Sequence, residues 1–67
     1  MSEWVVLRLT LIGTNDIFRF EAHVKSYYDF SPQIHRDGMM IVERGLTREK
    51  AFALAGTLND MLDTHDA

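Results

Sequence analysis

Two segments near the N-terminus alternate apolar and polar residues with a period of two, and a short turn-forming sequence separates them. The segments cover residues 4–12 and 17–25, and both are rich in the β-branched and aromatic residues that favour strands. Residues 13–16, Gly-Thr-Asn-Asp, are types that tolerate the left-handed backbone of tight turns. The sequence therefore predicts an antiparallel β-hairpin.

Joining Ile12 to Ile17 across the turn predicts a register in which every pair on one face is apolar. The pairs on this face are Val5 with Val24, Leu7 with Ala22, Leu9 with Phe20, and Leu11 with Phe18. A slip of one residue would bring Arg8 and Glu21 to this face, and a charge there is costly. We therefore expect this face to be the core.

The middle of the chain predicts a loop and a third strand. Residues 26–38 show no sustained period and contain the single proline, so they are expected to form an irregular loop. An Asp-Gly turn signal closes this segment, and the apolar residues at 39–43 follow it as a short strand. Residues 33–36 are an alternative fourth strand that would pair with it.

Residues 48–62 are predicted to form a C-terminal helix. Thr47 is a favoured N-cap, and Glu49 in the first turn suits the positive end of the helix dipole. Gly56 costs helix stability, and we interpret it as a point where the helix closely approaches the sheet. Apolar residues recur at helical spacing and form one stripe, which consists of Ala51, Leu54, Ala55, Leu58, Met61 and Leu62.

This order of elements predicts a single α+β domain over residues 1–67: a small antiparallel three-stranded meander with one C-terminal helix packed on one face. One helix covers only one face of such a sheet. The other face would expose a contiguous apolar patch, and such a patch needs an explanation. One explanation is that residues 26–36 fold over it, and the other is that it binds a protein. The patch consists of Trp4, Val6, Ile12 and Ile17.

Composition and motifs argue against an enzyme. The 67 residues contain no cysteine, which excludes disulfides and thiolate metal sites. His23, His35 and His65 lack the spacing of metal ligands. Neither a nucleophile elbow nor a glycine-rich phosphate loop is present. We therefore expect no catalytic, cofactor or metal site.

Charge and hydropathy argue against a membrane or a nucleic acid as the partner. The longest apolar run falls far short of the roughly 20 residues of a membrane span. The first residues also lack the basic region of a signal peptide, so we expect a cytoplasmic protein that does not bind a membrane. The net charge of −3 argues against nucleic acid as a partner, although Arg8, Arg19 and Lys25 share a predicted face with Trp4.

These observations predict a non-catalytic protein-interaction module that binds a larger partner protein and acts as a homodimer. A large aromatic side chain such as Trp4 would anchor the interface. The tyrosines after the second strand and the acidic helix end extend the candidate surface. The candidate partner-binding residues are Trp4, Val6, Ile12, Ile17, Tyr27, Tyr28, Asp60 and Asp63.

Two alternatives remain open at this point. A small, acidic, cysteine-free chain without motifs resembles in kind, though in no specific residues, the inhibitors of host defence or nucleic-acid machines that phages and mobile elements encode, such as anti-CRISPR proteins. An inhibitor of this type would compete for a basic channel through its acidic residues. The other alternative is a small regulatory nucleic-acid binder.

Overall fold

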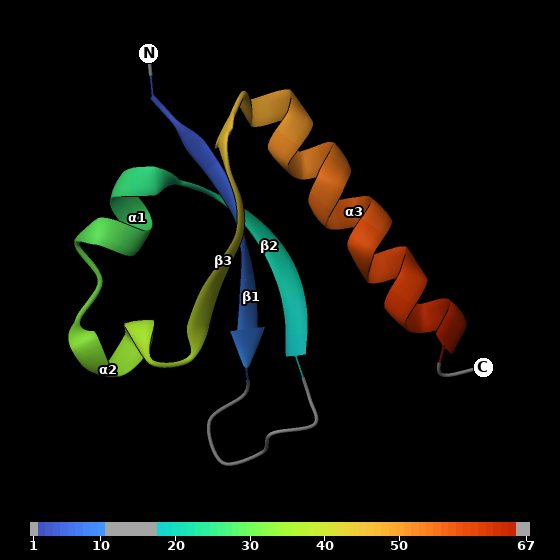
Figure 1. Ribbon diagram of the computed structural model, residues 1–67, viewed down its shortest axis with the longest axis horizontal. Helices are drawn as coiled ribbons and strands as arrows, with labels where there is room; N and C mark the ends of the chain where they lie inside the picture. Colours follow the sequence, from blue (N-terminus) through green and yellow to red (C-terminus); the bar gives the residue numbers. More distant parts are fainter. Residues whose placement is uncertain (1, 11–17, 66–67) are drawn as a thin grey trace.

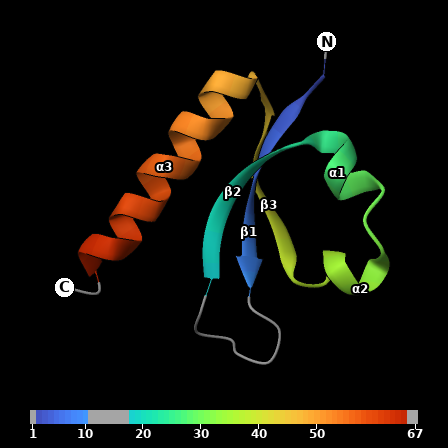
Figure 2. The ribbon, with the colours of Figure 1, turned by 180° about the vertical axis from the view of Figure 1, so that it is seen from behind.

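The computed structural model describes residues 2–10 and 18–65 and contains a sheet with helices on both sides (Figure 1). The long helix α3 lies on one side, and the short helices α1 and α2 lie on the other, as the view from behind also shows (Figure 2). The elements in chain order are β1 (Trp4–Thr10), β2 (Phe18–Val24), α1 (Lys25–Asp29), α2 (Gln33–Arg36), β3 (Met39–Leu46) and α3 (Arg48–His65).

The α+β class, the three-stranded antiparallel sheet and the C-terminal helix are confirmed. The strand order is β2-β1-β3, so β1 is central and pairs with both neighbours. The expected meander is wrong in this respect, because the chain passes from β2 through α1 and α2 to the far side of β1. The expected irregular loop at 26–38, with its alternative fourth strand at 33–36, contains these two helices instead.

The register of the hairpin differs from the prediction by one residue. Val6 lies opposite Ala22, and Arg8 lies opposite Phe20, so the predicted pairing of Leu9 with Phe20 is wrong. The physical reason is that β1 is apolar on both faces, and alternation therefore did not single out one face as the core. The turn, with Ile12 and Ile17 beside it, lies outside the described residues.

The face of the sheet below α3 carries the main hydrophobic core. Val6 is fully buried there against Ala51 and Ala55 of the helix. The helical stripe predicted from the sequence is largely confirmed, although Met61 is exposed. Half-buried hydrophobic residues surround this core, and they are Trp4, Phe20, Ala22, Leu46, Leu54 and Leu58.

The opposite face of β1 is buried as well. Val5 and Leu7 are fully buried, and because side chains alternate along a strand they point away from α3. Figure 1 places α1 and α2 on that side. The ring of Tyr27 in α1 stacks on His23 of β2 with centroids 4.1 Å apart. Residues 25–36 therefore cover the second face, but the two faces are exchanged relative to the prediction.

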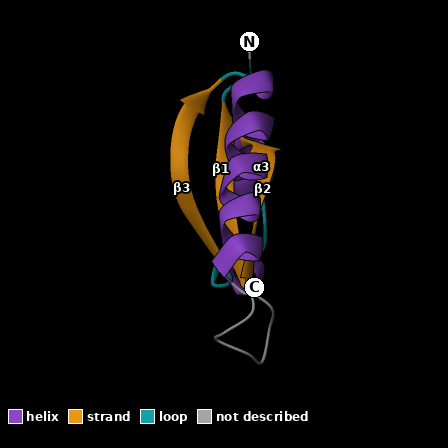
Figure 3. Cartoon of the chain, turned by 90° about the vertical axis from the view of Figure 1, so that its right-hand side faces the viewer, coloured by secondary structure: helices purple, strands orange, loops and turns teal. Residues whose placement is uncertain are grey.

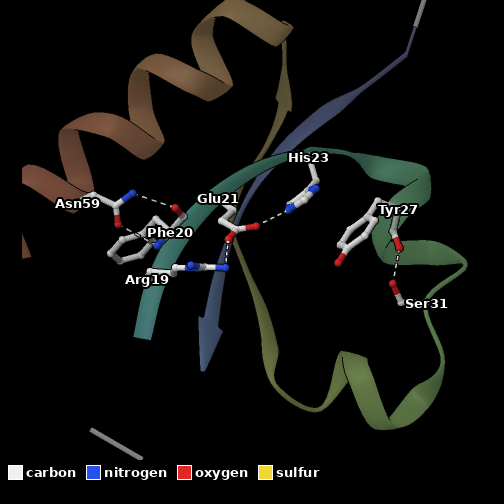
Figure 4. Close-up of polar contacts among 7 residues, drawn as sticks. All are labelled: Arg19, Phe20, Glu21, His23, Tyr27, Ser31 and Asn59. Atoms are coloured by element: carbon white, nitrogen blue, oxygen red, sulfur yellow. Dashed lines mark hydrogen bonds and ion pairs between the residues drawn. The ribbon is translucent and has the colours of Figure 1, made fainter. Parts of the chain in front are cut away.

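A side-chain amide joins α3 to the outer edge of β2 (Figure 4). The main-chain N–H of Phe20 donates to Asn59 Oδ1 at 2.9 Å, and Asn59 Nδ2 donates to the main-chain oxygen of Phe20, also at 2.9 Å. Asn59 thus binds both main-chain groups that this residue directs away from β1. A neighbouring strand would make the same two bonds.

The start of α3 follows the prediction. The main-chain N–H of Lys50 donates to Thr47 Oγ1 at 3.2 Å, which confirms Thr47 as the N-cap. Gly45 turns the chain there with a φ of +71°, and its N–H donates to Glu3. The hydrogen bonds from Arg44 and from Gly45 hold the pKa of the Glu3 carboxyl below its ordinary value.

Gly56 has no close neighbour, so the interpretation that it allows a close approach of helix and sheet is wrong. We predict that Gly56→Ala raises the free energy of unfolding by about 0.5–1 kcal/mol, because alanine loses less backbone entropy in a helix. Urea unfolding followed by circular dichroism measures this change. The control Ala53→Gly, at an exposed site of the same helix, should lose a similar amount. A loss of stability in Gly56→Ala would contradict the open environment.

We predict that Asn59→Ala lowers the free energy of unfolding by about 1–2 kcal/mol, because both hydrogen bonds to Phe20 are lost. The same urea titration compares it with Thr57→Ala, an exposed change on α3 that should leave stability nearly unchanged. Equal stability of the two variants would show that Asn59 does not hold the edge of β2.

Candidate protein-interaction surface

An apolar groove of about 420 Å³ lies between α3 and β3. It exists because α3 packs on β2 and β1 and leaves β3 beside it, as Figure 3 shows. Three apolar side chains of the groove are exposed: Met40 at 55%, Val42 at 43% and Met61 at 61%. The α3–β3 groove is lined by Arg8, Phe18, Phe20, Met40, Val42, Leu58, Met61 and Leu62.

Arg8 is the one charged residue among the described residues that line the groove. Its guanidinium carbon lies 5.0 Å from the centre of the Phe18 ring. Its Nε is shielded from solvent and has no hydrogen-bond partner. Among the described residues, Nε of Arg36 in α2 is also shielded and without a partner. None of the ion pairs between described residues involves Arg8. A shielded donor without an acceptor is energetically unfavourable, so Arg8 is a candidate binding residue.

The hydrogen-bonding directions along the sheet follow from the contact of Asn59 with Phe20. Since Phe20 directs its main-chain groups outward to Asn59, Arg8 opposite it directs its own groups to β3. The bond from Thr10 N–H to Gly38 oxygen, at 2.9 Å, agrees with this alternation. From Arg8 to Thr10 the even-numbered residues of β1 therefore bind β3, and the register of this pairing shifts on either side of Val6.

The outer edge of β3 is open in the described part of the chain. Met40 lies opposite Arg8 and directs its main-chain groups to β1, so Met39 and Ile41 direct theirs outward. No hydrogen bond between described residues reaches these outward groups. In Figure 3, β3 forms one side of the sheet without a described segment beyond it. The two edges thus differ at one position: Asn59 of α3 binds both outward groups of Phe20 in β2. No described side chain does the same for Met39 or Ile41 in β3.

The two leading residues of the predicted partner patch lie under α3. Val6 is fully buried in the core. The ring of Trp4 lies 5.7 Å from the ring of Phe52, and the guanidinium of Arg48 lies 6.0 Å from the centre of the Trp4 ring. The expectation that Trp4 and Val6 point to an uncovered face is therefore wrong. Their burial results from the one-residue difference in register.

The remaining predicted residues are not brought together. Tyr27 and Tyr28 belong to α1, on the side of the sheet opposite to α3, where the ammonium of Lys25 lies 5.6 Å from the Tyr28 ring. Asp60 is exposed on α3, and the side chain of Asp63 is outside the described residues, as are Ile12 and Ile17. Sequence reasoning missed the groove, although the recurrence of apolar residues at 40 and 42 was a signal for it.

The structure was also searched for a metal site and a membrane-spanning helix, and the chain was compared with known proteins. Among the described residues, no group of three potential ligands is placed to hold a metal ion. No described helix has the length and apolar character needed to cross a membrane. Comparison of the chain with protein-family models, with curated proteins and with solved structures finds no significant match. The function must therefore be argued from the surface itself.

We predict that Arg8→Met leaves the melting temperature unchanged or raises it, because methionine keeps an apolar stem and removes the unpartnered Nε. Thermal unfolding followed by circular dichroism measures the change. Arg44→Met is the matched control, since it removes an arginine that does donate to Glu3. A loss of more than about 1 kcal/mol in Arg8→Met would show that the guanidinium stabilises the fold.

Proposed function

We propose that the chain is a non-catalytic protein-interaction module that forms a homodimer through the edge of β3 and binds a larger partner as a dimer. The observation that carries this proposal is the difference between the two edges of the sheet. In β2, Asn59 of α3 binds both outward main-chain groups of Phe20. In β3, the outward groups at Met39 and Ile41 are open, and the apolar side chains of Met40 and Val42 are exposed. An open edge strand is a template for pairing with another strand.

The sequence of β3 suits pairing with a second copy of itself. In an antiparallel register centred on Ile41, the two copies of Ile41 exchange both main-chain hydrogen bonds. Met40 then lies opposite Val42 of the second copy, and the reverse pair repeats across the two-fold axis. These apolar cross-strand pairs add stability, and the symmetric contact closes at two subunits.

The dimer expected from the sequence was based on an uncovered sheet face. The dimer proposed here is based on the open edge of β3. Both faces of β1 are covered, so neither offers the flat platform on which an open sheet stacks nucleic-acid bases. This favours a protein partner over RNA. Pairing at β3 would place the two α3–β3 grooves next to each other, with one α3 helix flanking each side. A cytoplasmic location is part of the proposal and rests on composition alone.

Sedimentation equilibrium over a wide range of micromolar concentrations tests the dimer. We predict that the mass of the parent chain rises from 7.7 kDa towards twice that value, because β3 pairs with itself. Val42→Lys should remain monomeric. In the proposed pairing each new lysine would lie opposite the apolar Met40 of the second copy and diagonal to the second copy's own lysine, which carries the same charge.

Phe30→Lys is the matched control, because it makes the same change of charge at a residue that is 87% exposed and outside the sheet. It should dimerise like the parent. A parent chain that stays at 7.7 kDa throughout, or a Val42→Lys variant that dimerises equally well, would refute pairing at β3.

A further inference from the structure

In the described part of the chain, the α3–β3 groove combines apolar walls with one cation, Arg8. The exposed side chains Met40 and Met61 stand on either side of it, and methionine adapts its shape to different apolar ligands. Arg8 lies between them on the central strand, with its Nε shielded and unpartnered. The cation is thus held in surroundings of low polarity, where an opposite charge interacts more strongly than it does in water.

The chemistry of the Arg8 guanidinium indicates which ligand group suits the groove. A guanidinium donates two parallel hydrogen bonds to a carboxylate, and its fixed planar shape matches that group. A bound carboxylate would accept from the terminal nitrogens of the Arg8 guanidinium, which are not among the shielded atoms. A phosphate is less suited, because Arg8 is the one cation among the described residues that line the groove, and up to about one further negative charge of the phosphate would remain uncompensated.

We infer that each α3–β3 groove binds a segment of a partner protein in which an apolar side chain is adjacent to an Asp or Glu, and that Arg8 binds the carboxylate. The inference goes beyond self-association. Pairing at β3 uses outward main-chain groups, whereas the groove lies on the side of the sheet that faces α3. Each copy therefore contains a complete groove, and a monomer would bind the segment as well.

A random peptide library displayed on phage and selected on the parent protein tests the inference. We expect the selected peptides to be enriched in Asp or Glu next to Leu, Ile, Met or Phe. The affinity of one such peptide is then measured by fluorescence polarisation for the parent, Arg8→Met, Met61→Gln and the control Phe30→Gln. Selection of no peptide, or of peptides without enriched acids, would overturn the inference.

The arginine and the acid should act as one pair. Replacing the acid of the peptide by its amide, or Arg8 by Met, should each weaken binding about tenfold or more, and both changes together should cost little more than one. Met61→Gln should also weaken binding, because it replaces an apolar wall of the groove by a neutral polar side chain, and Phe30→Gln should not. Equal binding of the acidic peptide to the parent and to Arg8→Met would overturn the role of Arg8.

The two proposals fail separately in these experiments. Arg8→Met should sediment like the parent, since Arg8 makes no contact in the proposed β3 pairing. A monomeric parent that still binds acidic peptides would refute the dimer alone. A dimeric parent without acidic peptide ligands would refute the groove alone.

Discussion

The burial of β1 on both faces is the constraint on which the rest of the structure depends. Val5, Val6 and Leu7 are consecutive and fully buried, so each face of the strand must be covered. Burial of apolar surface is the main stabilising contribution to the folding of a domain of this size. The long helix α3 covers one face, and the connection of α1 and α2 covers the other.

Local patterns predicted most of the elements. The hairpin, the third strand and the helix with its Thr47 cap follow from periodicity and capping, which act over a few residues. The register and the strand order could not be predicted in this way. The run Val5-Val6-Leu7 is apolar at successive positions, which is typical of a strand covered on both faces, so alternation gave no basis for choosing the core face.

The candidate surface was harder to predict because it depends on where α3 lies across the sheet. A helix over β2 and β1 buries Trp4 and leaves Met40 exposed, and no pattern within one segment specifies that lateral position. Met61 follows the apolar stripe of α3 and was therefore expected in the core. Arg8 was assigned to the uncovered face of the sheet, whereas the structure places it on the side of α3, opposite Phe20 and in the groove.

The same arrangement makes the two edges of the sheet unequal. Because α3 reaches β2, Asn59 can bind the outward groups of Phe20 there. The helix does not extend over β3, so that strand keeps both an open edge and an apolar side. A natural sheet edge of this kind is normally blunted or paired, and in the proposed dimer a second copy would satisfy the open main-chain groups.

Amide hydrogen exchange measured by NMR at several protein concentrations tests the inequality of the edges most directly. The account predicts that the Phe20 amide is protected at every concentration, because Asn59 accepts its hydrogen bond. The amides of Met39 and Ile41 should exchange quickly in dilute solution and become protected as concentration rises. Rapid exchange at Phe20, or no change at Ile41 with concentration, would contradict the account.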